Sequence, residues 1–344
     1  MAQLALGIGM SHSTMVTLDD SLWGEWAAQD STFVILFDTE GQAVTYAQLA
    51  ERAGNRYAQQ ATPQHWKEQY TAVRQAVARL VADVASARLD VLVVVGDDQL
   101  ELFSFSNIPA LAVFYGDRIV SGLWTSRFAA YQRQRQPPSA PLSQRLQRAV
   151  VEGYAMDAHR TFASAPNFAQ ELLASLIDQS FDAAGLGEIP STDESAGLGH
   201  AYGAIVTQIM GEKPIPIVPV LVNTYFPPNQ PTPSRCYDLG LALHQAIETS
   251  PSDLRVGIVA SGGLSHFVTD ERLDRQLLTA LRTGSEEQLR AIPPKLLNAG
   301  SSEIRNWIAV AAACKHLKLV WDEYIPVYRT PAGTGCGLGF ACWS

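Results

Sequence analysis

Apolar residues along the chain alternate between short continuous runs and longer stretches with helical periodicity. Runs of strand length occur at Leu4–Ile8, Asp90–Val95, Ala110–Tyr115, Ile215–Val222 and Arg255–Ala260. The Val and Leu content of the second run is typical of a strand that is covered on both faces. The fourth run is interrupted by Pro216 and Pro219, so we expect this strand to be bulged or near a sheet edge.

Helical patterns lie between these runs. The clearest covers Trp66–Ala87, where apolar residues recur on one side and charged residues on the other. Further helices are predicted within Phe162–Phe181 and at Tyr237–Thr249, and a proline-rich loop at Gln132–Ser143. Strands that alternate with helices predict an α/β fold around one mixed or parallel sheet. Because no internal repeat is evident, we expect residues 1–344 to form a single domain with a helical and loop excursion over about residues 120–199.

Composition and charge argue against several classes of protein. The 344 residues can bury a sizeable core, and 47% of them are hydrophobic while 17% are charged. The net charge of −9 argues against nucleic acid or an anionic membrane as the main partner. No apolar run reaches membrane-spanning length, and the four cysteines show no CxxC spacing. We therefore expect a cytoplasmic protein with free thiols and no membrane partner.

Histidines beside glycine or serine turns are the main candidates for chemistry. The chain has only 7 histidines, and three of them lie beside such turns: His12, His200 and His266. His266 follows an apolar run and the turn Ser261–Gly263, so we expect it at the end of a buried strand, where α/β sheets bind their ligands. His12 comes directly after the first predicted strand. An ordinary hydrogen-bonding or capping role is the commoner interpretation for His12, and a structural role stays open for His266 as well.

Carboxylates supply the second set of candidates. The segment Gly96–Glu101, with the sequence GDDQLE, ends a predicted buried strand and is rich in oxygen donors, although adjacent carboxylates often only solvate a turn. Glu303 opens an apparent helix, where a carboxylate also favours the helix dipole. A non-haem ferrous site typically needs two histidines and one carboxylate on one face. These residue types are therefore compatible with such a site without establishing it.

Two other motifs are disfavoured by their context. The glycine-rich tail Gly333–Phe340 does not follow a strand within a βαβ unit, as a dinucleotide-binding fingerprint would. Ser261 and Ser265 do not lie in a GxSxG elbow, which argues against a serine hydrolase.

In order and spacing, the candidate segments together resemble the class III extradiol ring-cleaving dioxygenases, the family of the protocatechuate 4,5-dioxygenase catalytic β subunit. The similar segments are Gly7–Thr14, Val91–Phe103, Asn107–Pro109, Gly199–Gly203, Pro214–Asn223, Pro233–Gly240, Ser261–His266 and Gly300–Trp307. The extended N-terminus, the DDQxE turn and the tail Thr330–Phe340 are most similar to the 3-O-methylgallate dioxygenase branch. The resemblance implies a single catalytic domain with a central mixed sheet flanked by helices.

The resemblance also implies roles for individual residues. His12 matches the family's first Fe(II) ligand, and Glu303 matches its carboxylate ligand. His266 matches the catalytic acid–base histidine, and His200 matches a histidine that contacts a substrate hydroxyl. Substrate-binding walls are expected at Asn223, Tyr225 and Tyr202.

One position departs from the family pattern. Gln99 aligns where protocatechuate enzymes place their second histidine ligand. An amide oxygen is a neutral and weaker donor for iron than an imidazole. The third ligand therefore stays open between Gln99, Asp98 and Glu101, and a shift in metal preference is a further alternative.

The function implied is that of a non-haem Fe(II)-dependent extradiol dioxygenase. Its partners would be O2 and a small aromatic diol such as 3-O-methylgallate, gallate or protocatechuate. Because Trp23–Ala87 or Gln132–Ser195 could supply a lid in place of a small partner subunit, we expect a homodimer. Two alternatives stay open: a non-catalytic binding relative on the same fold, which the loss of a histidine at Gln99 favours, and a zinc-dependent hydrolase or amidase.

Overall fold

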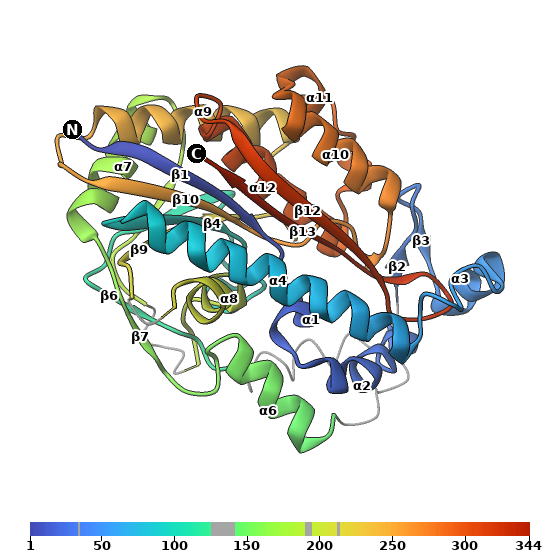
Figure 1. Ribbon diagram of the computed structural model, residues 1–344. Helices are drawn as coiled ribbons and strands as arrows, with labels where there is room; N and C mark the ends of the chain where they lie inside the picture. The colour runs from blue at the N-terminus through green and yellow to red at the C-terminus, as the bar shows by residue number, and fades with distance from the viewer. Residues whose placement is uncertain (34, 125–141, 190–194, 212–213) are drawn as a thin grey trace.

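The computed structural model describes residues 1–33, 35–124, 142–189, 195–211 and 214–344 (Figure 1). The strands of its main sheet are β1 (Gln3–Met10), β4 (Val91–Gly96), β5 (Leu111–Phe114), β8 (Ala184–Leu186), β9 (Ile217–Val222), β10 (Arg255–Ser261), β11 (His266–Val268), β12 (Leu319–Tyr328) and β13 (Thr334–Trp343). Two small ribbons pair β2 (Leu36–Phe37) with β3 (Ala43–Val44), and β6 (Arg118–Val120) with β7 (Thr161–Ala163).

The helices follow the predicted alternation with strands. They are α1 (Thr14–Thr17), α2 (Trp23–Ala27), α3 (Tyr46–Ala53), α4 (Pro63–Ala87), α6 (Gln144–Gly153), α7 (Pro166–Asp178), α8 (His200–Ile209), α9 (Pro233–Thr249), α10 (Glu271–Thr283), α11 (Glu286–Arg290) and α12 (Ile304–Ala313). Short 3-10 turns are η1 (Asp20–Leu22), η2 (Asp30–Thr32), η3 (Pro294–Leu296) and η4 (Ala299–Glu303).

The main sheet is mixed and has nine strands, in the order β11-β13-β1-β10-β4-β9-β5-β8, with β12 paired to β13. Its central strands β1, β10, β4 and β9 are parallel to one another. The strands β13 and β5 flank these four and run antiparallel to β1 and β9 respectively, and β8 pairs in parallel with β5. The predicted single-domain α/β fold with a central mixed sheet is thus confirmed. Because the central strands are parallel, their carboxyl ends meet at one edge, where such sheets bind ligands.

Helices cover both faces of this sheet (Figure 1). On one face α9 and α12 pack against β1, and on the other face α4 and α8 pack against β1 and β4 respectively. All of β4 is buried, and its alternate residues enter separate cores: Val93 lies in the core beneath α12, and Val94 in the core beneath α4. This confirms the prediction of a strand that is covered on both faces.

Two glycines let α12 approach β1 closely. A Cβ atom on Gly9 would lie 2.2 Å from the Trp307 ring, and one on Gly7 would lie 2.2 Å from Cys314 Sγ. Both contacts are far shorter than any real carbon contact, so a side chain at either glycine would push the helix from the sheet. The close packing holds the start of α12 near the carboxyl edge of the sheet.

The prediction that the run Ile215–Val222 forms a bulged strand or one near a sheet edge was wrong for β9. This strand lies in the interior of the sheet, between β4 and β5, and pairs in continuous register with both. Its antiparallel ladder to β5 covers only residues 220–222, so Pro219 has no partner residue on β5. Pro216 precedes the strand. A proline is tolerated here because the ladder on that side does not extend to it.

The predicted excursion over residues 120–199 contains α6, β7, α7 and β8 among the described residues. Most of the predicted loop Gln132–Ser143 lies outside the described residues.

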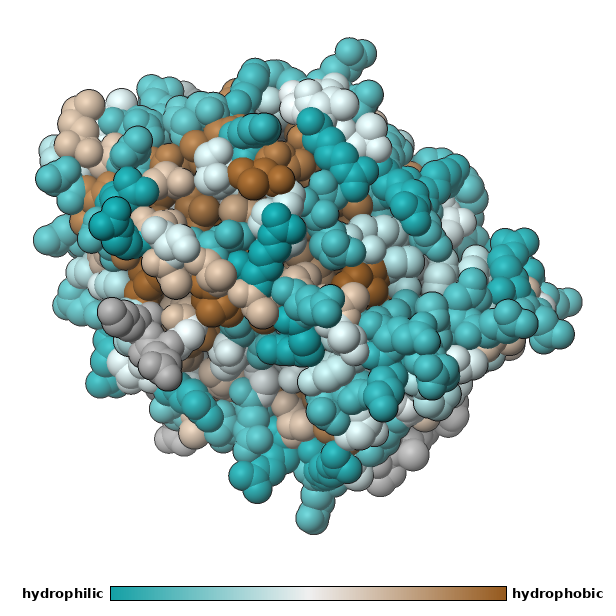
Figure 2. Space-filling view, in the orientation of Figure 1, coloured by the Kyte–Doolittle hydropathy of each residue, from teal (hydrophilic) through white to brown (hydrophobic). Residues whose placement is uncertain are grey.

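Figure 2 shows the face covered by α4 as mainly hydrophilic, with small apolar areas around β12 and α4. No helix within the described ranges is both long and apolar enough to cross a bilayer. All four cysteines are buried and free.

Candidate functional site

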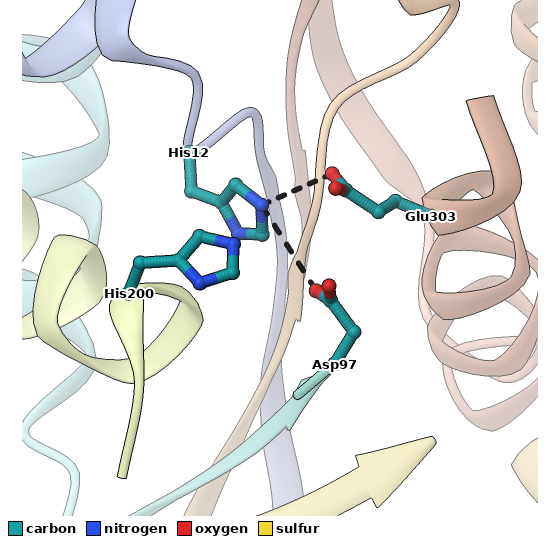
Figure 3. Close-up of side chains that lie close together, drawn as sticks. All are labelled: His12, Asp97, His200 and Glu303. Carbon is teal, nitrogen blue, oxygen red and sulfur yellow. Dashed lines mark ion pairs between the residues drawn. The ribbon is translucent and has the colours of Figure 1, made fainter. Parts of the chain in front are cut away.

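Side chains from several elements meet at the carboxyl edge of the parallel strands. His12 follows β1, Asp97 follows β4, His200 begins α8, and Glu303 ends η4 directly before α12. All four are buried, and one potential ligand atom of each lies within 4.8 Å of those of the others. Figure 3 shows His12 pointing toward the carboxylates of Glu303 and Asp97, with the His200 ring beside it. We call these four residues the strand-end group.

The tautomer of His12 is set by a neighbouring serine. The Ser261 hydroxyl donates to the Ala201 carbonyl at 2.6 Å, so its oxygen can accept the proton of His12 Nδ1 at 3.0 Å. The remaining ring nitrogen, Nε2, then carries a lone pair. A neutral imidazole held in this way by its other nitrogen is the form that binds metals.

The His12 lone pair faces two carboxylates. Nε2 lies 3.0 Å from Glu303 Oε2 and 4.0 Å from Asp97 Oδ1. Both His12 Nε2 and Asp97 Oδ1 are buried without a hydrogen-bond partner among the described residues. Acceptor atoms that face one another in a buried site repel unless a proton or a metal cation lies between them. The donor set of imidazole and carboxylate oxygens therefore fits a divalent transition metal.

Gln99 reaches the same group with its side-chain amide. Its Nε2 lies 3.2 Å from Asp97 Oδ2, 3.3 Å from Glu303 Oε1 and 3.5 Å from His200 Nε2. In this orientation the amide donates to the carboxylates. A half-turn of the amide would present its oxygen to the same position.

The carboxylates of Asp98 and Glu101, the other two candidates for the third ligand, are bound to other groups of the protein. The Asp98 carboxylate accepts the backbone N–H groups of Leu100, Leu102 and Phe103, at 3.0, 2.7 and 3.2 Å, and so closes the turn after β4. The Glu101 carboxylate pairs with His200 Nδ1. The sequence pointed to Asp98 and Glu101, but the carboxylate beside His12 is that of Asp97, the first residue after β4.

Glu101 keeps His200 charged. Burial alone would lower the pKa of His200, but the charge and the hydrogen bond of Glu101 raise it to about 10. The ring of His200 lies 4.7 Å from that of His12, with an interplanar angle of 71°. His200 is thus a cation that is fixed through Nδ1.

His266 faces the other carboxylate oxygen of Glu303, Oε1, whereas His12 faces Oε2. Its Nδ1 donates to the Leu264 carbonyl at 2.9 Å, and its Nε2 lies 3.3 Å from Glu303 Oε1. Burial would lower the pKa of His266, but the Glu303 charge raises it well above the usual value. A Cβ on Gly300 would lie 1.7 Å from the His266 ring, so this glycine makes room for the imidazole.

The two carboxylates of the strand-end group differ in pKa. Burial opposes ionisation of Glu303, but a positive charge on the facing His12 and His266 rings lowers its pKa well below the usual value. Burial, followed by the Glu303 charge, raises the pKa of Asp97 to about 6. Glu303 is therefore the permanent anion of the group.

These residues open into a cavity of about 110 Å³. An apolar cavity of roughly 150 Å³ holds benzene, so the space is of the order of one aromatic ring. Besides His12, Gln99, Glu101, His200, His266 and Glu303, its lining includes Ser13, Thr14, Trp26, Trp124, Tyr154, Phe267 and Arg329. Sequence reasoning missed these last side chains, although Trp26 lies in a segment that was predicted as a lid.

The three predicted substrate-binding residues lie outside the lining of this cavity. Asn223 donates to the Phe226 carbonyl at 2.7 Å and accepts from the Phe226 N–H at 2.9 Å, so it shapes its own loop. The Tyr202 hydroxyl donates to the Val220 carbonyl at 3.2 Å, and the Tyr225 ring packs against Phe226. Their contact with substrate stays a prediction.

Two comparisons with known proteins bear on this site. Residues 110–339 match the family model described as the catalytic LigB subunit of aromatic ring-opening dioxygenase. Gallate dioxygenase from Pseudomonas putida is 54% identical over 59 residues, a stretch that spans 17% of this chain and 17% of that relative. The family match covers most of the chain and confirms the resemblance predicted from the sequence. The chain belongs to the family of the catalytic LigB subunit of aromatic ring-opening dioxygenases.

Proposed function

We propose that this protein is a non-haem Fe(II)-dependent extradiol dioxygenase that opens the ring of a small catecholic or gallate-type substrate with O2. The observation that carries the proposal is the buried lone pair of His12 Nε2, which faces Glu303 and Asp97 at the wall of a ring-sized cavity. Family membership and the partial similarity to a gallate dioxygenase support the same reaction class.

His12 and Glu303 would hold the metal. The third ligand is either Gln99, through its amide oxygen, or Asp97, whose Oδ1 is buried without a partner. A ferrous ion there would bring O2 together with both oxygens of a catechol and allow electrons to pass between them. His200 is a weaker candidate, because Glu101 already holds it as a cation.

His266 is the proposed acid–base residue. Its Nδ1 proton is committed to the Leu264 carbonyl, so Nε2 is the atom that exchanges a proton with a substrate hydroxyl. Glu303 beside Nε2 stabilises the imidazolium, and a metal cation bound to Glu303 would weaken this interaction and allow Nε2 to take the proton. The same proton can later return from Nε2 to an oxygen of the product.

The remaining lining positions the ring. His200, fixed by Glu101, presents its Nε2 side as a donor to the second hydroxyl. The Tyr154 hydroxyl donates to the His12 carbonyl at 2.9 Å, so Tyr154 supports the ligand while its ring lines the cavity. Aromatic side chains such as Trp26 and Trp124 exclude water from the ring faces.

We also propose that the chain acts in the cytoplasm as a homodimer without a small partner subunit. The presence of Trp26, from the segment Trp23–Ala87, in the cavity lining supports this proposal. Size-exclusion chromatography of the active protein tests this, and a requirement for a second chain would contradict it.

Oxygen uptake under controlled metal loading tests the reaction. The protein is loaded anaerobically with Fe(II) and mixed with gallate, 3-O-methylgallate or protocatechuate in separate reactions. We expect uptake of one O2 per ring opened, dependent on Fe(II). Zinc binding with hydrolysis and no oxygen uptake would indicate a hydrolase. Absence of any bound metal would indicate a non-catalytic relative, the alternative that Gln99 favours.

A further inference from the structure

One cationic side chain of the cavity lining has no part in the proposed mechanism. Arg329 follows β12 and is 4% exposed. Among the described lining residues it is the single Arg or Lys. A guanidinium stays charged in proteins, and a buried charge needs compensating partners. The partners of Arg329 therefore indicate what this part of the cavity can bind.

The protein provides hydrogen-bond partners for only some of the N–H donors of the Arg329 guanidinium. Nε lies 2.8 Å from Asp30 Oδ2, and the two side chains are 3% and 1% exposed. Nη2 is buried and has no hydrogen-bond partner among the described residues. An unmet donor in a buried site is destabilising, so we expect an acceptor from outside the chain to complete it.

The acidic residues of the lining do not supply that acceptor. Glu101 pairs with His200, and Glu303 lies between His12 and His266. Within the described ranges, the ion pair of Arg329 is with Asp30 alone. Among the described residues, Arg329 is thus not ion-paired with the carboxylates of the strand-end group.

A carboxylate is the anion that suits this arrangement. The planar guanidinium binds carboxylates through two parallel N–H groups, and a partner at Nε fixes its plane. The lining of the same cavity includes Trp26 and Phe267, which suit an aromatic ring. A ligand that joins a ring to a carboxylate would meet both features.

We propose that Arg329 binds the carboxylate of the substrate, which makes the protein selective for dihydroxybenzoic-type acids over neutral catechols. Asp30 is the positioning residue that orients the guanidinium. This inference rests on the proposed function for the diol end of the ring and assigns a protein partner to the acid end.

Ligand binding to the metal-free protein tests the subsite without any turnover. Trp26 and Trp124 line the cavity, so tryptophan fluorescence reports occupancy. The probes are 3,4-dihydroxybenzoate and 3,4-dihydroxybenzamide, which share the ring and the diol but carry an anionic carboxylate and a neutral amide respectively. We expect the wild type to bind the acid at least about 30-fold more tightly than the amide, as for a buried charged pair. Arg329→Gln should reduce this preference to less than about 3-fold, and Arg329→Lys should retain part of it.

Two further variants guard against misfolding and general charge effects. Arg329→Gln leaves Asp30 buried without its partner, so the double variant Asp30→Asn/Arg329→Gln removes both charges together. Arg282 is the matched control, because its Nε and Nη2 bind Asp322 on the surface. Arg282→Gln should keep the full preference for the acid.

The proposal is overturned if the wild type binds acid and amide equally, or if folded Arg329→Gln or the double variant keeps the preference. Failure of the dioxygenase proposal would look different. In that case the wild type would discriminate acid from amide through Arg329 and yet consume no O2 with any ring acid.

Discussion

The two ends of β1 carry similar side chains in different settings. At its carboxyl end lies the strand-end group, which is buried. At its amino end, His244 and Glu248 on α9 lie with His316 in a second group of potential ligands, which is half-buried or exposed. We call these three residues the strand-start group. Residue types alone would assign a metal to both groups.

Hydrogen bonding separates the two groups. In the strand-start group, Glu248 accepts the Leu4 N–H at 2.8 Å, and His316 Nε2 donates to the Leu4 carbonyl at 3.2 Å. Only His244 Nδ1 there is buried without a partner among the described residues. In the strand-end group two acceptors face each other, His12 Nε2 and Asp97 Oδ1. The difference teaches that unmet, mutually repelling acceptors indicate a cation site better than residue types do.

The largest contrast should come from removing one imidazole at each end. We expect His12→Ala to abolish both Fe(II) binding and oxygen uptake, because it deletes the nitrogen that faces both carboxylates. His316→Ala should leave both unchanged. Metal analysis after anaerobic loading, with oxygen uptake on the same samples, measures this. Equal loss of iron in the two variants would erase the proposed difference between the groups.

Substitution of His266 should reduce turnover without reducing iron binding. His266→Gln should lower turnover by about 10²–10⁴-fold, the usual contribution of a general acid–base residue. Its iron content should stay at the wild-type level, since Nδ1 and Nε2 serve Leu264 and Glu303. Loss of iron in this variant would move His266 into the ligand set.

The third ligand can be located with Asp97→Asn and Gln99→Ala. Because Asp97 Oδ1 has no other partner, we expect Asp97→Asn to weaken Fe(II) affinity by about 10–100-fold or more. Gln99→Ala should have a smaller effect, since its amide donates to the carboxylates. Competition with a chelator gives both affinities. The reverse order would identify Gln99 as the ligand.

The smallest expected effect is a decrease in thermal stability at low pH that arises from His244 in the strand-start group. Burial, then the His316 charge, lowers the pKa of His244 below its usual 6.5. As the pH falls through 6.5, the unfolded chain binds a proton before the folded protein does, so this group makes the fold less stable in acid. His316→Gln should lessen the fall in Tm between about pH 8 and about pH 5. An unchanged or larger fall would contradict this coupling.

Much of the fold followed from local patterns. The run Val91–Val95 and the periodicity of Trp66–Ala87 identified β4 and α4, because burial on two faces or on one leaves a direct trace in the sequence. The position of β9 did not follow, since its prolines argued for an edge, whereas the partner ladder simply stops before Pro219. Pairing between distant strands is not encoded in a local pattern.

The candidate site, like the fold, could be predicted only in part from the sequence. His12, Glu303 and His266 stand out because each adjoins a turn at the end of a strand or helix, and the structure brings them together around Glu303. Arg329 and Tyr154 also line the cavity, but no sequence feature of this kind identified them as candidates. Their roles depend on tertiary neighbours such as Asp30, which is almost 300 positions away in the chain.

The spacing set by Gly9 also affects the carboxyl edge of the sheet, where the strand-end group lies. Trp307 rests where a Gly9 side chain would be, and its indole N–H donates to the Gly262 carbonyl at 2.8 Å. Glu303 lies one helical turn before Trp307, so the missing methyl group governs how near this carboxylate comes to His12. Anyone who transplants this centre to a new scaffold would have to copy that empty place along with the ligands, since the reach of Glu303 is inherited from a residue that has no side chain at all.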